Sequence, residues 1–165
     1  MTPSRENVQF MVDALKADPS VGTLAEVAAG VVQLYYRPTD TVVHFWNATP
    51  GEKRVTATEV HTHRYAFLST VLYGQFTNVR FDVMPDPEGD FQVSIADVDN
   101  KAGTGTITET PERVSIVSRT EDVLKQGQTY HMRVDQFHHT CVEKDSITWA
   151  QQEKPAVASP VLLLV

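Results

Sequence analysis

The sequence predicts an all-β, single-domain protein: a barrel or sandwich of short strands preceded by a short helical segment. After Gly30, short runs of β-branched and aromatic residues alternate with turns rich in glycine, proline and aspartate. This spacing is typical of sandwiches and barrels. The 165 residues are enough to bury one core, and the 41% hydrophobic and 21% charged residues are those of a globular domain.

The first thirty residues are predicted to be helical. Apolar residues recur at helical spacing between Val8 and Leu15, with Ser4 as the N-cap and Pro19 as the stop. A second short helix is expected over residues 24–29, where a glycine ends the pattern. The N-terminal segment would therefore lie outside the β-structure.

The rest of the chain is interpreted as about ten short strands separated by turns. We divide the chain into the helical segment (1–30), a β-barrel (31–154) and a tail (155–165) that packs on the barrel or on a partner chain. The expected strands cover residues 31–37, 42–47, 56–63, 67–73, 76–83, 91–96, 105–110, 114–118, 129–134, 140–143 and 147–150.

Charge and composition narrow the class of partner. The net charge of −7 and the absence of a Lys/Arg cluster argue against nucleic-acid binding, which needs a basic face. Cys141 is a single cysteine, so no intrachain disulfide is possible. The N-terminus lacks the apolar core of a signal peptide, and the longest apolar run (161–165) is too short to span a bilayer. We expect a cytoplasmic protein without a membrane partner.

Two histidine clusters are the candidate functional residues. His61 and His63 form an H-x-H pair, and on a strand both would project to the same side, about 7 Å apart. The second cluster contains His131, His138 and His139. Adjacent strand residues point to opposite faces, so His138 and His139 cannot both face one metal ion from a regular strand. The hypothesis is that the two clusters meet at a divalent ion.

The spacing of these histidines and of two glycines resembles the cupin superfamily of jelly-roll metalloproteins. The first cupin motif is H-x-H, three or four residues, a glutamate, six residues and a glycine. Here the pair at 61 and 63 supplies the histidines, Gly74 fits the glycine, and Phe67 stands at the glutamate position. In the second motif a histidine follows a glycine by eleven residues, as His138 follows Gly127. The resemblance implies a jelly-roll barrel with His61, His63 and His138 as metal ligands.

Departures from the two motifs limit the resemblance to one subgroup of the superfamily. Arg133 and Asp135 stand where the second motif has proline and glycine. The glutamate missing at Phe67 fits a three-histidine subgroup similar in outline to cysteine dioxygenase. This implies Fe(II) as the expected ion, with Zn, Ni, Cu and Mn as alternatives, because affinity for three imidazoles does not select one metal. The Ser-x-His-x-Tyr run of cysteine dioxygenases is absent, so cysteine is not implied as the substrate.

Several residues near the motifs are candidates for contact with a substrate. If Phe67 occupies the place of the glutamate, Phe67 and Ser69 share a strand face with the site and would bind substrate, although simple core packing is the slightly preferred explanation of Phe67. Tyr130 is the candidate catalytic residue and a further substrate contact, through its hydroxyl. Arg64 and Arg37 are candidates to neutralise a substrate carboxylate, although exposed arginines are commonly without such a role.

Other titratable residues have ordinary explanations. Glu59 is a weak candidate for an extra ligand or an acid–base group, and His131 is expected to face solvent. His139 would point outward or orient a ligand. His44 is expected in the core or on the surface without a metal role, and Cys141 as an inert strand thiol.

Three functions follow from these expectations. The leading hypothesis is a metal-dependent cupin enzyme, a non-haem Fe(II) dioxygenase acting on a small molecule, and a homodimer is one expected assembly. The second is a non-redox metal enzyme (an isomerase, lyase or hydrolase) on the same fold. The third is a non-catalytic cupin that binds a small molecule, because one fold hosts many activities.

Overall fold

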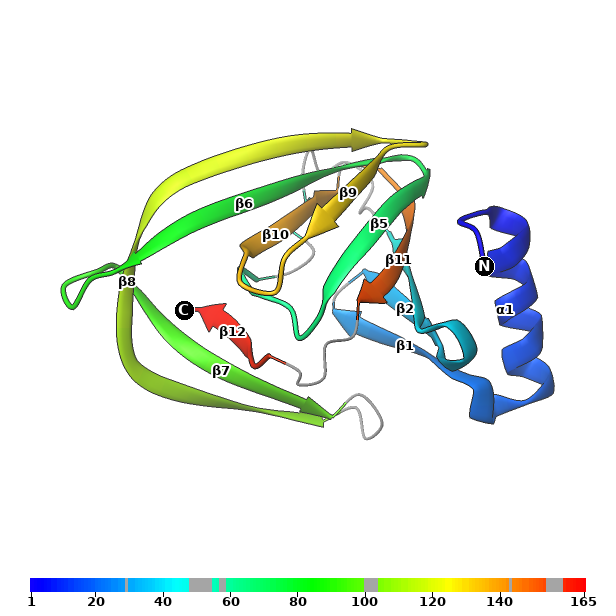
Figure 1. The fold of residues 1–165 in the computed structure, drawn as a ribbon, viewed down its shortest axis with the longest axis horizontal. Helices are drawn as coiled ribbons and strands as arrows, with labels where there is room; N and C mark the ends of the chain where they lie inside the picture. Colours follow the sequence, from blue (N-terminus) through cyan, green and yellow to red (C-terminus); the bar gives the residue numbers. More distant parts are fainter. Residues whose placement is uncertain (29, 48–54, 57–58, 100–103, 143, 154–158) are drawn as a thin grey trace.

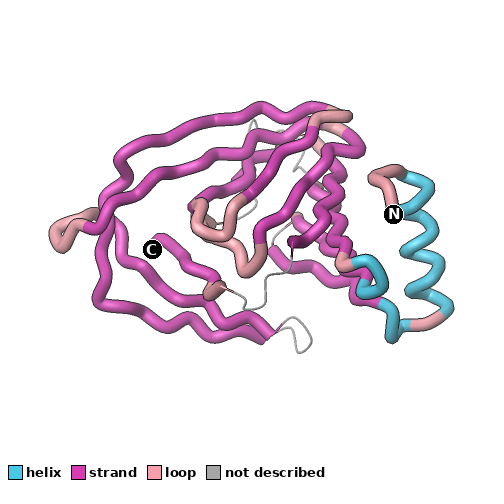
Figure 2. Tube along the Cα trace, viewed as in Figure 1, coloured by secondary structure: helices cyan, strands magenta, loops and turns pink. Residues whose placement is uncertain are grey.

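The computed structural model describes residues 1–28, 30–47, 55–56, 59–99, 104–142, 144–153 and 159–165. One helix precedes an otherwise β-structured chain (Figures 1 and 2). In chain order the elements are α1 Arg5–Ala17, η1 Pro19–Val21, β1 Gly22–Ala28, β2 Val31–Tyr36, η2 Arg37–Thr39, β3 Thr41–Trp46, β4 Val55–Thr56, β5 Ala66–Tyr73, β6 Gln75–Pro85, β7 Phe91–Asp99, β8 Thr104–Lys125, β9 Thr129–Met132, β10 Phe137–Val142, β11 Ser146–Glu153 and β12 Val161–Leu164.

Two antiparallel six-stranded sheets form a sandwich, which confirms the predicted all-β fold class. The first sheet has the order β1-β2-β3-β11-β5-β9, and the second has the order β12-β7-β8-β6-β10-β4. In both sheets, strands that are distant in sequence lie side by side. For example, β3 is the neighbour of β11 in the first sheet, and β7 is the neighbour of β12 in the second. Between the sheets, the ring of Trp46 stacks on that of Phe76 with centroids 6.1 Å apart.

Helix α1 covers the outer face of the first sheet (Figure 2). Ser4 caps the helix as predicted, because its hydroxyl oxygen accepts a hydrogen bond from the Asn7 N–H at 3.2 Å. Val8 and Met11 are buried against Leu34 and Trp149 of the sheet. The opposite, inner face of the same strands is therefore left to pack on the second sheet.

The second sheet bends back on itself through β8, which runs along both β6 and β7 (Figure 1). The bend encloses an apolar cluster to which β12 contributes Leu164. We call this group the bend cluster; its buried members are Val79, Phe81, Val93, Val114, Phe137, Cys141 and Leu164. The predicted strands 105–110 and 114–118 are parts of the single strand β8. Pro111 is tolerated there because the pairing with β7 is irregular at that point, so the missing N–H breaks no regular ladder.

The second predicted helix, over residues 24–29, is wrong. Residues Gly22–Ala28 form β1, which pairs antiparallel with β2. A run this short gains little as an isolated helix, and pairing with β2 satisfies its backbone instead. A Cβ at Gly22 would lie 2.3 Å from the carbonyl oxygen of Tyr35, so glycine permits the close approach of the two strands.

The predicted strand 56–63 is also wrong. β4 ends at Thr56, residues 57 and 58 lie outside the described residues, and His61 pairs only through isolated bridges to His138 and Leu163. Glu143, the last residue of the predicted strand 140–143, likewise lies outside the described residues, and β10 begins earlier, at Phe137.

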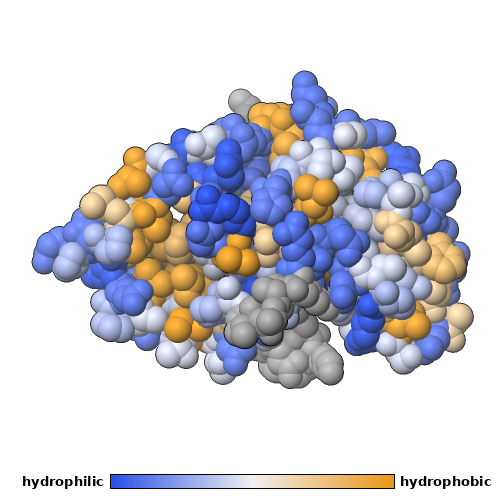
Figure 3. Space-filling view, viewed as in Figure 1, coloured by the Kyte–Doolittle hydropathy of each residue, from blue (hydrophilic) through white to orange (hydrophobic). Residues whose placement is uncertain are grey.

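No helix in the described part of the chain is long and apolar enough to cross a membrane. On the face drawn in Figure 3, apolar side chains form separate patches among polar ones.

Candidate metal centre

The segment 60–63 carries two of the histidines and is held between two strands. On one side, the His61 N–H donates to the His138 carbonyl and the His138 N–H donates to the His61 carbonyl, both at 2.9 Å. On the other side, the Thr62 N–H donates to the Leu162 carbonyl, and the Leu162 N–H donates to the Thr62 hydroxyl, both at 2.9 Å. Thr62 thus points toward β12 while its two histidine neighbours point into the sandwich. The segment keeps the alternation of a strand without belonging to one.

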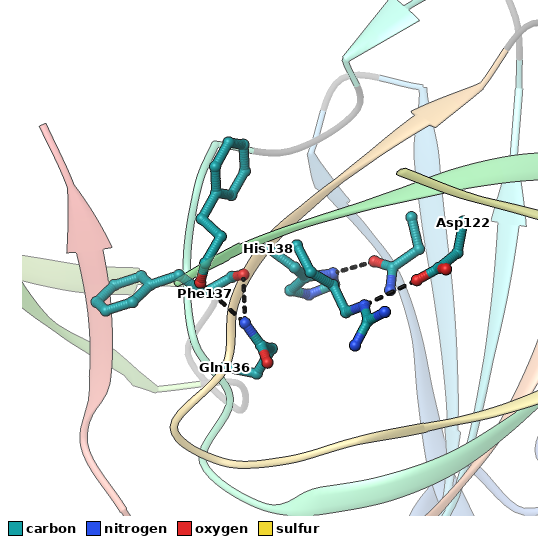
Figure 4. A network of polar contacts seen from close by, with 7 residues as sticks. Asp122, Gln136, Phe137 and His138 are labelled. Atoms are coloured by element: carbon teal, nitrogen blue, oxygen red, sulfur yellow. Dashed lines mark hydrogen bonds and ion pairs between the residues drawn. The ribbon is translucent and has the colours of Figure 1, made fainter. Parts of the chain in front are cut away.

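The third histidine comes from β10, in the second sheet. His138 is buried, and its Nδ1 lies 2.7 Å from Oδ1 of Asn78 on the neighbouring strand β6 (Figure 4). Since an amide oxygen only accepts, the Nδ1 of His138 carries the proton and donates it. The Nε2 of His138 is then left with a lone pair. This arrangement, in which the outer ring nitrogen donates to a fixed acceptor, is the one commonly found at metal-bound histidines.

His61 is oriented by the same device. Its Nδ1 lies 2.7 Å from the backbone carbonyl oxygen of Glu59 and must donate to it, so its Nε2 also carries a lone pair. The Nε2 of His63 lies 2.6 Å from the Nε2 of His138. One ligand nitrogen from each of the three rings lies within 4.8 Å of the other two.

The donor set fits a metal ion. Lone pairs that converge this closely repel unless a cation lies between them. A proton on the Nε2 of His63 satisfies the pair with His138, but a divalent ion with tetrahedral or octahedral preferences would accept all three nitrogens. The cluster could therefore bind a metal ion, although its ligands do not determine which.

The surroundings keep these imidazoles neutral. Burial lowers the pKa of His61, and it lowers the pKa of His63 and His138 well below 6.5. Neighbouring imidazoles lower the last two further, because a positive charge on one ring disfavours a charge on the next. Neutral rings are the form that coordinates a metal.

The cluster opens into a cavity of about 310 Å³ between the sheets. This volume is at the lower end of the range for small-molecule sites. Phe67, Ser69 and Tyr130 all line the cavity, and the Phe67 ring lies edge-on to His63 with centroids 4.7 Å apart. Burial raises the pKa of Tyr130 to about 12, and a hydrogen bond with Ser69 acts in the opposite direction. The Tyr130 hydroxyl is therefore protonated at neutral pH.

Other predicted candidates lie apart from the cluster. His131 is exposed on β9, with its Nε2 3.6 Å from Oε2 of Glu153. His139 points to the bend cluster and packs edge-on to Phe81, with ring centroids 5.3 Å apart. In the part of the chain that the structure describes, the carboxylate of Glu59 is not in the metal-binding group, and only its backbone carbonyl takes part.

The remaining candidates divide between the cavity and the rest of the molecule. Arg64 lines the cavity, and its Nη2 lies 3.5 Å from Oδ1 of Asp97. Arg37 instead donates to the carbonyls of Ser20 and Gly22. Cys141 is a free, buried thiol of the bend cluster.

Sequence reasoning missed two residues of this site. The sequence does not indicate Asn78, because an asparagine in a strand carries no signal of its own until its partner strand is known. His44 was assigned to the core or surface without a metal role, yet it lines the cavity with the cluster. Its position two residues before Trp46 on an otherwise apolar strand is the signal that could have indicated an inward-facing polar group.

No protein-family model matches the chain, and no curated protein matches it in sequence. Among solved structures, the chain is similar to the CENP-C cupin domain of Drosophila melanogaster, at 9% identity and a TM-score of 0.44 over 90% of this chain and 96% of that one. It is similar to hydroquinone 1,2-dioxygenase from Sphingomonas sp. TTNP3 at 15% identity and a TM-score of 0.35, over 71% of this chain and 61% of that one. It is similar to an oxalate oxidase in complex with the substrate analogue glycolate at 11% identity and a TM-score of 0.33, over 90% of this chain and 57% of that one. The chain thus spans less than two thirds of the length of these two enzymes.

Proposed function

We propose that the chain is a metal-dependent enzyme: a non-haem Fe(II) dioxygenase acting on a small molecule, with His61, His63 and His138 as ligands of the ion. The observation that carries the proposal is the convergence of three imidazole nitrogens on a buried cavity, with two rings oriented by fixed acceptors. Side chains used only for packing have no reason to be arranged in this way.

The ligand set also supports the choice of chemistry. Among the described residues, no carboxylate joins the three histidines. Three neutral imidazoles would leave a divalent ion its full charge and open coordination positions, so a bound Fe(II) would supply redox chemistry with dioxygen and a small-molecule ligand. The protein's part is to fix the three nitrogens and to exclude water.

Residues of the first sheet shape the space beside the histidines. Phe67 packs against both His63 and Tyr130, with the second pair of ring centroids 6.1 Å apart, and forms an apolar wall that keeps water away. Tyr130 keeps its phenolic proton and can donate it in a hydrogen bond to a bound molecule, with Ser69 opposite it on the neighbouring strand. We assign substrate contact to these three residues.

A non-redox enzyme is the second candidate, favoured by the same ligands. Three histidines with an open fourth position also form catalytic zinc sites, in which the ion acts as a Lewis acid. The two candidates differ in their need for oxygen and for a metal that changes oxidation state.

Metal analysis of protein purified without chelator tests the proposal. We expect one equivalent of iron in the wild-type protein, and its loss in His63→Ala. His131→Ala is the matched control, since His131 is an exposed histidine away from the cluster, and it should retain the metal. Oxygen consumption on addition of substrate would support the dioxygenase. Activity under anaerobic conditions with Zn(II) would support the non-redox enzyme, and equal metal content in the two variants would contradict both.

A further inference from the structure

The cavity has a second group of polar side chains, on the wall formed by the first sheet. Gln33 on β2 and His44 on β3 both line the cavity. They are directly opposite each other in the antiparallel pairing, so their side chains share one face of the sheet and lie close together. Neither side chain has a hydrogen-bond partner among the described residues.

His44 is held in place by its neighbours. Its ring lies against that of Trp46, with centroids 5.3 Å apart and planes at 36°. Trp46 is fixed in turn, because its Nε1–H donates to the Thr148 hydroxyl at 3.0 Å and its ring stacks on Phe76. The imidazole therefore faces the cavity on a rigid support, as a binding group should.

The chemistry of this pair is that of a donor and an acceptor together. Burial, and then the charge of His61, lower the pKa of His44 to about 4, so the ring is neutral at pH 7. A neutral imidazole offers one N–H and one lone pair, and the Gln33 amide likewise both donates and accepts. A hydroxyl group, which also donates and accepts, would satisfy both side chains.

The remaining lining indicates the charge of the ligand. Apart from the histidines, Arg64 is the one titratable side chain with a positive charge among the described residues that line the cavity, and no aspartate or glutamate joins it. Val42, Phe67 and Ala150 make the intervening wall apolar. Arg64 is partly neutralised by Asp97 outside the lining, but a positive ion in a cavity whose described lining holds no carboxylate still favours a negatively charged ligand.

We propose that Gln33 and His44 bind a hydroxyl group of a small anionic substrate, a hydroxylated carboxylic acid with an apolar body, whose acidic group is held at the three histidines. This assignment rests on the proposed metal centre. It adds a second recognition point on the opposite sheet, so that the ligand bridges the sandwich. Gln33 and His44 are half-buried, and without the hydroxyl neither side chain has a hydrogen-bond partner among the described residues; this is the source of the selectivity.

Matched pairs of acids that differ by one hydroxyl group test the proposal. Benzoate is compared with 4-hydroxybenzoate, and butanoate with 4-hydroxybutanoate, by calorimetric titration of the metal-loaded protein and by its tryptophan fluorescence. We expect the hydroxylated member of at least one pair to bind about tenfold more tightly. In His44→Phe, which keeps a ring against Trp46, the preference should disappear, and His44→Asn should restore part of it.

His131→Phe is the matched control, because it removes an exposed imidazole outside the cavity; it should keep the preference. A preference that survives in His44→Phe overturns the proposal, as does a failure of every acid to bind protein that holds one equivalent of metal. In both cases the metal centre itself would stand. Protein that takes up no metal would instead overturn the proposed function, and this inference with it.

Discussion

The two faces of β10 lie in regions of opposite character. His138 and Thr140 face the cavity between the sheets, and the ring of His138 is held by Asn78. Phe137 and Cys141 face the bend cluster on the other side of the same strand. His139 follows His138 directly, and its ring packs edge-on to Phe81 of the bend cluster.

This difference separates the source of stability from the source of function. The bend cluster is filled by buried side chains, and each buried valine, phenylalanine or leucine contributes roughly 1.5 to 3 kcal/mol by leaving water. The cavity keeps an internal space of about 310 Å³ and holds imidazoles whose pKa burial has lowered, which costs folding free energy as the pH falls below 6.5. A protein selected only for stability would fill this space with apolar side chains.

Replacing the two adjacent histidines separately tests this comparison most directly. Removing a residue that only orients a metal ligand lowers metal affinity by up to roughly 100-fold. His138→Ala removes a ligand itself, so it should lower metal affinity by more than this. Chelator-competition titrations would measure the affinity.

The matched variant is His139→Ala, one residue along the chain. It removes an equal volume from the bend cluster and should lower the melting temperature while leaving metal affinity unchanged. Equal losses of metal in the two variants would show that β10 supports the site only through its backbone.

The neutral imidazoles of the cavity predict a pH dependence of the metal-free protein. The folded-state pKa of His44 is about 4, below its ordinary value of 6.5. The unfolded chain therefore binds more protons between these values, and stability is lost as the pH falls through this window. The shift corresponds to about 3 kcal/mol for His44, and His61, His63 and His138 add to it in the same direction. Urea unfolding between pH 7.5 and 4.5 would measure the slope.

His44→Phe provides the control for this pH dependence. The variant should flatten the slope by about one proton while the contributions of the cluster remain. An unchanged slope would mean that His44 titrates normally in the folded protein.

Asn78 should matter to the site without being a ligand. Asn78→Leu removes the acceptor for Nδ1–H of His138, so the ring loses its fixed tautomer and orientation. We expect metal affinity to fall by roughly 10- to 100-fold. Asn78→Asp keeps an acceptor at the same place and should retain most of the affinity. If the leucine variant binds metal as well as the wild type, packing alone orients His138.

The sequence was sufficient to predict the fold class and to predict that the three histidines lie at one site. Alternation along β10 separates His138 from His139, and this inference depends on local periodicity, which strands preserve. The resemblance to the cupin motif, through its glycine spacing, indicates His138 as the ligand. The same alternation predicts that His61 and His63 project to one side. They do so although they lie on a segment held by isolated β-bridges and not on a regular strand.

The site residues and the strand that the sequence does not predict depend on pairing between strands. Asn78 becomes relevant only because β6 lies beside β10, and His44 only because β3 faces the histidines across the sandwich. The local pattern of β1 predicts a helix for the same reason, since pairing with β2 decides the conformation of this segment. Register between distant strands is not encoded in the local pattern of any one of them.

A buried valine on the apolar side gives the smallest expected effect on the metal centre. Val79 is fully buried in the bend cluster, on the strand β6 that also carries Asn78 on its other face. Val79→Ala should lower the free energy of unfolding by about 2 kcal/mol through lost burial and a cavity, or the melting temperature by about 5 °C. Metal affinity should not change, because the substitution leaves the face with Asn78 and His138 intact. A loss of metal in this variant, measured at a temperature where it is fully folded, would mean that strain crosses the sheet and that its two sides are not independent.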